Sequence, residues 1–261
     1  MILDKFRLND RVSIVTGAAS GIGKELATGL AEAGSHIVIA DINIDGARHV
    51  ADRIAAELGV RTLAIQADIT DESKLDEMVD RAMETFGRID VLVNNAGIGA
   101  RIAIEEMSTA DWQRMMDVNL NSVFLVSKAV GRVMIKQQRG SIINISSISG
   151  IAVNVPQYQT AYNVSKSGVI MATRSMAVEW ARYNIRINTI APGYMKTEMT
   201  AKDFDENSER NPMVRKWMEL TPMNRPGTPD ELQGIALYLA SDASSFATGG
   251  VFVVDGGYTL L

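Results

Sequence analysis

The chain has 261 residues, of which 46% are hydrophobic and 22% are charged. This length and composition supply a full apolar core, so they exclude intrinsic disorder and disulfide-stapled miniature folds and favour one domain over 1–261. A formal net charge of −5 offers no basic surface to nucleic acid or anionic lipid, and zero cysteines exclude thiolate metal sites. We therefore expect a cytoplasmic protein with a small-molecule partner, no nucleic acid and no membrane.

Short apolar runs alternate with longer segments of helical spacing, and this alternation predicts parallel strands joined by crossover helices. The strand centres are apolar at nearly every position, as expected where helices cover both faces of a sheet. The predicted strands are 11–17, 36–41, 61–68, 89–97, 140–147, 185–193 and 251–257. The predicted fold class is α/β, a Rossmann-type three-layer sandwich with a seven-stranded parallel sheet.

Between the strands, helices are predicted at 22–33, 44–58, 72–86, 108–137, 161–183 and 229–240. Asp71 and Asp111 are the predicted N-caps of the third and fourth helices. The segment 194–226 differs from the rest because it is methionine-rich and charged and holds three of the six prolines. We predict that it leaves the sheet as a mobile helical lid over the substrate.

A glycine cluster stands where the first predicted strand meets the first helix. In TGAASGIGKE, Gly17, Gly21 and Gly23 follow a G-x-x-x-G-x-G spacing. Glycines there let backbone amides approach a diphosphate at the positively polarised helix N-terminus. A bare structural turn would use the same residues, but the position after the first strand favours a dinucleotide site. A mononucleotide P-loop is rejected because Ala18 and Glu25 replace its required glycine and Ser/Thr.

Asp41 ends the second predicted strand, within the ~20-residue distance at which an acid binds the adenosine ribose of NAD. Its carboxylate can accept hydrogen bonds from both ribose hydroxyls, whereas it would repel a 2′-phosphate. Asn43 and Ser20 occupy nearby positions where a basic side chain would serve that phosphate. The sequence therefore predicts NAD, with NADP less favoured. The alternative is that Asp41 is an ordinary strand-end acid.

Tyr162 and Lys166 are four residues apart on a predicted helix, so they share one face with Cβ atoms about 5–6 Å apart. An ammonium ~6 Å from the phenol favours the phenolate by roughly 2–3 kcal/mol at an effective dielectric near 20, or about two pKa units. We expect a lowered pKa for Tyr162, which would make it a general base or acid near neutral pH. Such pairs also occur by chance on solvated helices, but the glycine loop favours catalysis.

Several motifs in a fixed order carry a resemblance to a known family. They are TGAASGIG at 16–23, NNAG at 94–97, Asn119, Ser147, YNVSK at 162–166 and PG at 192–193. Together they resemble the short-chain dehydrogenase/reductase family over essentially the whole chain. The loop SSISGIAVNVPQYQTAYNVSK and the ending VDGGYTLL are similar to those of its polyol and sugar dehydrogenases, of the galactitol, mannitol, arabinitol or sorbose type.

The resemblance implies four catalytic residues. Tyr162 would remove the substrate hydroxyl proton as hydride leaves for the nicotinamide, and Lys166 would also bind the nicotinamide ribose. Ser147 would hold the substrate oxygen, while Asn119 would kink its helix and anchor a water that leads to Lys166. The alternative for Asn119 is a satisfied mid-helix amide. Ser149 has the family's usual spacing of thirteen residues before Tyr162, but Ser147 is preferred because it directly follows the strand.

The resemblance also outlines the cofactor and substrate sites. The expected cofactor residues are Gly17, Ser20, Gly21, Ile22, Gly23, Asp41, Asp68, Ile69, Asn95, Ala96, Gly97, Tyr162, Lys166, Pro192, Gly193 and Thr197. The expected substrate residues are Ser147, Ser149, Asn154, Gln157 and Tyr162. Asp68 could equally cap the next helix, and Asn154 and Gln157 could equally serve turn chemistry. His36 and His49 lack metal-ligand spacing, so no metal site is predicted.

The leading prediction is an NAD-dependent dehydrogenase of secondary alcohols, with polyols or sugars ahead of sugar acids, steroids and acyl-carrier-bound ketoesters. A non-catalytic dinucleotide sensor would not need the four catalytic residues together. A sugar-nucleotide epimerase usually has a different glycine spacing and a larger C-terminal domain. We expect a homotetramer, because similar family members pair their long fourth and fifth helices and their last strands. The broad apolar face of 161–183 and the apolar C-terminal tail support it.

Overall fold

The computed structural model describes residues 1–204 and 211–261. Seven parallel strands form one sheet in the order β3-β2-β1-β4-β5-β6-β7. The strands are β1 Val12–Thr16, β2 His36–Asp41, β3 Thr62–Gln66, β4 Val91–Asn94, β5 Gly140–Ile145, β6 Ile185–Pro192 and β7 Val251–Val254. The predicted fold class and the seven parallel strands are confirmed.

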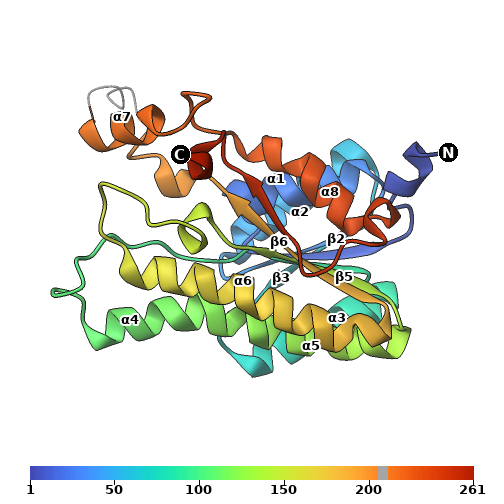
Figure 1. Ribbon diagram of the computed structural model, residues 1–261. Coiled ribbons are helices and arrows are strands. Elements are labelled where there is room, and N and C mark those ends of the chain that lie inside the picture. The colour runs from blue at the N-terminus through green and yellow to red at the C-terminus, as the bar shows by residue number, and fades with distance from the viewer. Residues whose placement is uncertain (205–210) are drawn as a thin grey trace.

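Helices cover both faces of the sheet, which makes three layers (Figure 1). One layer holds α1 Gly21–Glu32, α2 Ile44–Leu58 and α8 Gln233–Ala240. The other holds α3 Glu72–Phe86, α5 Ser122–Gln137 and α6 Thr160–Trp180, with α4 Thr109–Met116 preceding α5. Each layer buries its own apolar cluster against the sheet, so every central strand is apolar on both faces.

The helix N-caps agree with the sequence in one case and differ in another. Asp71 caps α3 by accepting a hydrogen bond from the Ser73 amide at 2.9 Å, as predicted. Asp111 is not a cap: Ser108 caps α4, and its Oγ accepts a hydrogen bond from the Asp111 amide at 3.0 Å. Serine and aspartate are both favourable at a helix N-terminus. Asp111 lies within the first turn of α4, where its negative charge interacts favourably with the helix dipole.

The long helix predicted at 108–137 is continuous but irregular. A π-helical turn, Asp117–Asn121, lies between α4 and α5. Such turns often mark functional sites. Among the described residues, Thr109–Gln137 is also the one helix with the length and composition to span a membrane, yet half of its most apolar window is buried inside the protein. It is therefore a core helix.

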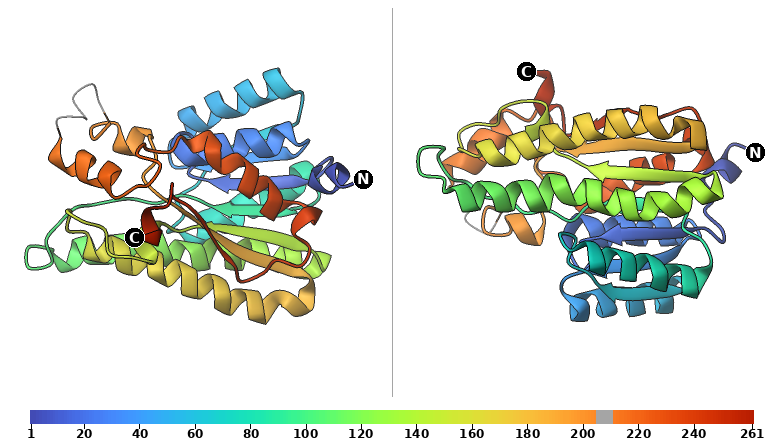
Figure 2. Two further views of the ribbon diagram at one scale, coloured as in Figure 1. Left: turned by 45° about the horizontal axis from the view of Figure 1, so that its top comes forward. Right: turned by 90° about the horizontal axis from the view of Figure 1, so that it is seen from below.

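The carboxyl ends of the strands meet at one edge of the sheet, where open α/β folds bind their ligands. The segment between β6 and β7 rises over this edge and contains the helix α7 Pro212–Glu219, which stands apart from the three layers (Figure 2). Phe204, Val214 and Trp217 form a small apolar core of their own there. Residues 205–210 of the predicted lid lie outside the described residues.

Candidate active site

A cavity of about 1220 Å³ opens at the carboxyl edge of the sheet. Its walls come from the segments that follow β1, β2, β3, β4, β5 and β6, so residues distant in sequence surround one space. Every cofactor, substrate and catalytic residue predicted from the sequence lines it, apart from Gly23 and Asn119. The fold therefore gathers the predicted residues into one site.

The glycine loop leaves the N-terminus of α1 open to this cavity. Ser20, the N-cap residue, makes no side-chain capping bond, so no cap covers the first-turn amides. Gly17 and Gly21 have positive φ angles of 63° and 54°, which glycine adopts without strain. A Cβ on Gly17 would lie 2.7 Å from the Ala96 Cα, and one on Gly23 would lie 2.4 Å from the Asn95 Nδ2. The open, polarised helix end fits a dinucleotide diphosphate.

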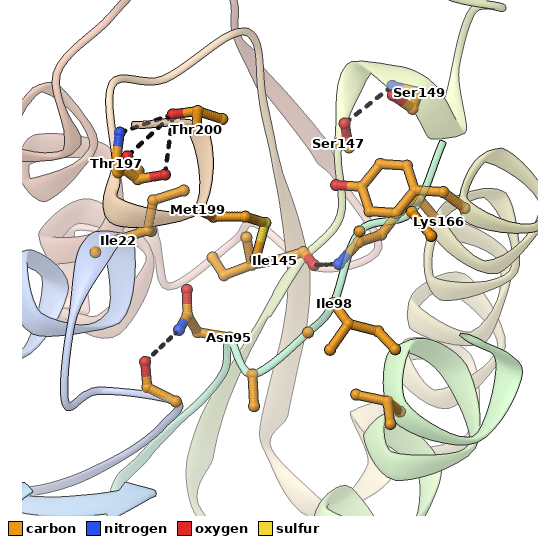
Figure 3. A pocket seen from close by; sticks show the side chains of 18 of the residues that line it. Ile22, Asn95, Ile98, Ile145, Ser147, Ser149, Lys166, Thr197, Met199 and Thr200 are labelled. Atoms are coloured by element: carbon orange, nitrogen blue, oxygen red, sulfur yellow. Dashed lines mark hydrogen bonds between the residues drawn. The ribbon is translucent and has the colours of Figure 1, made fainter. Parts of the chain in front are cut away.

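Asn95 fixes the loop after β4 beside the glycine loop. Its Nδ2 donates hydrogen bonds to the main-chain oxygens of Thr16 and Gly17, both at 3.0 Å. Figure 3 draws one of these two bonds. The amides of Asn95 and Ala96 donate to the Thr16 Oγ1 at 3.0 and 3.2 Å. These four bonds hold the two loops in register, which shapes the middle of the cavity.

The part of the cavity that follows β2 and β3 is acidic. Asp41 accepts hydrogen bonds from the Ala19 amide at 3.0 Å and the Asn43 amide at 2.9 Å. Asp68 accepts from the amide and the hydroxyl of Thr70, at 2.9 and 2.7 Å. Since Asp71 caps α3, the helix-cap interpretation of Asp68 is wrong. Among the described residues, the lining segments 17–22, 41–42 and 67–70 contain these two carboxylates and no basic side chain.

Lys166 and Tyr162 come from the first turns of α6; Lys166 is buried and Tyr162 is half-buried. The Lys166 Nζ lies 5.7 Å from the centre of the Tyr162 ring. It donates a hydrogen bond to the main-chain oxygen of Ile145 at 3.0 Å (Figure 3). Lys166 is only 5% exposed. The helix spacing thus brings phenol and ammonium together as the sequence predicts.

The electrostatics of this pair differ from the sequence expectation. Burial raises the pKa of Tyr162, and a hydrogen bond from Ser147 lowers it only in part. Burial also lowers the pKa of Lys166 to about 8. The expected lowering of the Tyr162 pKa by Lys166 is therefore wrong. The reason is that the loss of water on burial disfavours the charged form of both groups.

Of the two candidate serines, Ser147 is the one beside Tyr162, whose pKa it lowers by hydrogen bonding. Its Oγ also accepts a hydrogen bond from the Ser149 amide at 3.1 Å (Figure 3). Ser149 lines the same cavity, but its Oγ accepts from the Gln159 Nε2 at 3.0 Å. The two serines thus have different neighbours, although both are buried.

Asn119 lies in the π-helical turn and is 1% exposed. Its Oδ1 accepts a hydrogen bond from the Ile98 amide at 2.8 Å, and its Nδ2 donates to the Ile98 oxygen at 2.9 Å. A Cβ on Gly97 would lie 3.2 Å from the Asn119 Oδ1 and 3.5 Å from the Lys166 Nζ. Asn119 therefore sits behind the lining, where it pins the segment after β4 close to Lys166.

A polar wall extends from the serines toward the lid. The amide nitrogens of Asn154 and Gln157 donate hydrogen bonds to the Tyr194 hydroxyl at 3.2 and 3.0 Å. Burial raises the pKa of Tyr194 well above its ordinary value. The Gln157 Oε1 accepts a hydrogen bond from the Trp217 Nε1 at 2.8 Å, and Trp217 stacks on Tyr194 with ring centres 4.2 Å apart. Asn154 and Gln157 are thus built into the cavity wall rather than a surface turn.

The lining residues that sequence reasoning missed include Arg101, Gln159, Tyr194 and Trp217. Tyr194 had a usable signal because it directly follows the Pro192–Gly193 pair at the end of β6. The others had no such signal, since they reach the cavity from loops and from α7.

The predicted nicotinamide-end residue Thr197 lines the cavity, and its amide donates a hydrogen bond to the Thr200 Oγ1 at 2.9 Å (Figure 3). No cluster of three potential metal ligands occurs among residues 1–204 and 211–261.

A dinucleotide cradle on a Rossmann-type sheet, with a tyrosine, a lysine and a serine beside it, defines a nicotinamide-dependent oxidoreductase. Residues 17–259 match the family described as Enoyl-(Acyl carrier protein) reductase. The chain belongs to the short-chain dehydrogenase/reductase family and is an NAD(P)-dependent enzyme that acts on CH–OH groups. The enzyme prediction is confirmed.

Relatives of different activity are similar to this chain at comparable identity. Galactitol 2-dehydrogenase (L-tagatose-forming) of Cereibacter sphaeroides is 41% identical, over 98% of this chain and 97% of that protein. An NADP-dependent mannitol dehydrogenase of Hypocrea jecorina is 38% identical, over 99% and 96%. The 3-oxoacyl-[acyl-carrier-protein] reductase of Thermotoga maritima is 40% identical, over 97% and 100%.

Solved structures agree in fold over the full length. A short-chain type dehydrogenase/reductase from Mycobacterium marinum superposes with a TM-score of 0.94 at 39% identity and covers 100% of both chains. A gluconate 5-dehydrogenase from Burkholderia cenocepacia in complex with NADP and tartrate gives a TM-score of 0.92 at 39% identity, again covering 100% of both chains. The family and fold are therefore established, whereas the relatives differ in substrate and cofactor.

Proposed function

We propose that the protein is an NAD-dependent dehydrogenase that transfers hydride between a secondary alcohol of a polyol or sugar and the nicotinamide. The observation that carries this proposal is the single cavity that holds Ser147, Tyr162 and Lys166 together with the uncapped N-terminus of α1. The similarity to galactitol, mannitol and sorbose enzymes supports the substrate class.

The proposed chemistry is a balanced removal of a hydride and a proton from one CH–OH group. A bound nicotinamide dinucleotide supplies the hydride acceptor. Tyr162 accepts the hydroxyl proton, and Ser147 hydrogen-bonds the substrate oxygen. Lys166 binds the nicotinamide ribose and stabilises the phenolate through its positive charge. In the reverse direction, Tyr162 returns the proton to the alkoxide oxygen.

Asn119 is proposed to act through position rather than contact. Its two hydrogen bonds to Ile98 set the backbone beside Lys166. The polar surroundings there suit a water that links Lys166 to solvent. The lid, 194–226, is proposed to cover the substrate, because Tyr194, Thr197, Met199 and Trp217 line the cavity.

NAD is proposed over NADP because of the acidic adenosine end. The Asp41 carboxylate is fixed by two amides, so it cannot turn away from a 2′-phosphate without breaking them. One like-charge pair 4 Å apart costs on the order of 1 kcal/mol in water and 4 kcal/mol at an effective dielectric of 20. Two relatives are named as NADP-dependent, so the proposed preference for NAD rests on Asp41 of this chain and not on the relatives.

A sugar acid is the second candidate substrate. The observation that favours it is Arg101, a guanidinium in the cavity wall that could pair with a carboxylate. The named activities of two relatives, 2-dehydro-3-deoxy-D-gluconate 5-dehydrogenase and gluconate 5-dehydrogenase, are of this kind. A 3-ketoacyl or steroid reductase remains a third reading of the same scaffold, supported by the similarity to 3-oxoacyl reductases.

We also propose a cytoplasmic homotetramer. Along α6, Val164, Met171 and Val178 are 43%, 59% and 82% exposed at seven-residue spacing, and Phe124 on α5 is 56% exposed. Leu260 and Leu261 at the C-terminus are 82% and 85% exposed. Apolar stripes of this kind mark protein interfaces. In contrast, Ile170 and Ala177 are buried inside the subunit, so the interface is narrower than the sequence indicates.

The deciding experiment is a substrate panel. Polyols, ketoses, hydroxy acids and a 3-ketoacyl thioester are assayed with NAD and NADP by nicotinamide absorbance. The proposal expects the highest kcat/KM for a polyol or ketose with the NAD pair. Turnover confined to hydroxy acids or to acyl thioesters would assign the alternative activity instead.

A further inference from the structure

An arginine and an aspartate from distant segments form a forked ion pair in the cavity wall. The Arg101 Nη1 donates to the Asp203 Oδ1 at 2.8 Å, and the Nη2 donates to the Oδ2 at 2.6 Å. Arg101 follows β4, whereas Asp203 belongs to the segment after β6, and both line the cavity. The Arg101 side chain is 41% exposed and that of Asp203 is 12% exposed.

This pair is continuous with the polar wall of the proposed substrate site. The Arg101 guanidinium carbon lies 5.0 Å from the centre of the Trp217 ring. Trp217 in turn donates to Gln157 and stacks on Tyr194, which accepts from Asn154. The guanidinium therefore has two supports, the aspartate and the indole, which hold it in one orientation at this wall.

The pairing of Arg101 with Asp203 disfavours a negatively charged substrate. A two-bond fork to a carboxylate is how arginine recognises an acid, and Asp203 already occupies that fork. An anionic substrate would have to displace a partner held within the same chain. It would also leave the displaced Asp203 carboxylate unpaired and close to a second negative charge. A neutral polyol meets neither cost.

We propose that Asp203 is a specificity-determining residue: by holding Arg101, it selects neutral polyhydroxy alcohols and excludes sugar acids. This inference rests on the proposed function, because it chooses between the two substrate classes left there. Asp203 touches no reacting atom and acts through Arg101. The exclusion resides in the paired state of the guanidinium, so it disappears when the carboxylate is neutralised.

The test compares a hexitol with the aldonate of the same configuration, which differs from it by one carboxylate. Asp203→Asn removes the charge and keeps the shape, so the aldonate-to-hexitol ratio of kcat/KM should rise at least tenfold, or about 1.4 kcal/mol. Asp203→Glu keeps a carboxylate and should retain the wild-type ratio. In Asp203→Asn/Arg101→Gln the gain should be lost, because no guanidinium remains to bind the acid. Lys136→Gln, which removes an exposed cation that does not line the cavity, is the matched control and should leave the ratio unchanged.

A second readout does not depend on turnover. Calorimetric titration of the NADH-loaded enzymes with hexitol or aldonate reports binding in a dead-end complex, and Asp203→Asn should bind the aldonate at least tenfold more tightly than the wild type does. An equal loss of affinity for both ligands in Asp203→Asn would mean that the ion pair only stabilises the lid, and this result would overturn the inference. A wild type that prefers the aldonate would also overturn it.

The two proposals fail in distinguishable ways. A wild type that neither binds nor oxidises any polyol or ketose contradicts the proposed function. A wild type that oxidises the hexitol, with an unchanged ratio in a folded Asp203→Asn variant, contradicts only the role of Asp203. Circular dichroism and size exclusion establish that each variant is folded.

Discussion

The Lys166 Nζ donates its hydrogen bond to Ile145, the last residue of β5, so the ammonium is tied to the edge of the sheet. The same contact keeps the nitrogen away from water, and burial lowers the pKa of Lys166 to about 8 from its ordinary 10.5. The folded chain therefore binds fewer protons than the unfolded chain between these two values, and its stability should rise with pH in that window.

Lys166→Met tests this linkage in the cofactor-free protein. Below pH 8, Lys166 is protonated in both the folded and the unfolded wild type. The folded wild type is therefore destabilised by the full cost of burying this charge, on the order of 3 kcal/mol from the pKa difference. The variant should therefore melt at a higher temperature than the wild type at pH 7. Its advantage should shrink as the pH rises from about 8 toward 10.5. Thermal melts at matched pH values measure the difference, with exposed Lys136→Met as the control. An advantage that does not change with pH would contradict the lowered pKa.

Tyr162→Phe removes the group that moves the proton and keeps the half-buried ring. We expect kcat to fall by about 10²–10⁴-fold, the range of general acid–base catalysis. Binding of NADH, followed by its fluorescence, should stay within about twofold because the glycine loop is untouched. Tyr183→Phe, in the 3-10 turn that follows α6, is the control and should retain activity. A purified Tyr162→Phe enzyme with most of its turnover would refute the proposed chemistry.

Asp41 should set the cofactor preference. The wild type is expected to use NAD at least tenfold better than NADP in kcat/KM, about 1.4 kcal/mol of discrimination. Asp41→Asn should weaken that preference at least tenfold, because it removes the charge that repels the 2′-phosphate. Asp45→Ala removes an exposed acid of α2 and should change nothing. A wild type that prefers NADP tenfold or more would overturn the assignment.

The exposed stripe on α6 should hold subunits together. Light scattering after size exclusion should give the wild type a mass near four times 28.4 kDa. Met171→Glu/Val178→Glu places charges in the stripe, and we expect it to yield a smaller assembly with preserved far-UV circular dichroism. Ile2→Glu alters an apolar residue that is 65% exposed outside the stripe and serves as the control. A wild-type mass of 28.4 kDa across micromolar concentrations would disprove the tetramer.

Features that depend on local periodicity and spacing can be predicted from the amino-acid sequence alone. The alternation of apolar runs and helical segments predicts the seven strands, and the glycine spacing places a polarised helix end after β1. Tyr162 and Lys166 share a face because four residues complete about one helical turn. Such features need no knowledge of which distant segments meet.

Burial and contacts between distant segments, in contrast, are properties of the folded chain. The fold places Ser147 beside Tyr162, whereas Ser149 accepts a hydrogen bond from Gln159. The spacing in the sequence had left the choice between the two serines open. The fold raises the pKa of Tyr162, because desolvation is a property of the packed protein and not of a helix. It also joins Arg101 to Asp203 across 102 residues of chain. A sequence pattern cannot show this contact, because two residues so far apart in the chain meet only through the arrangement of the whole fold.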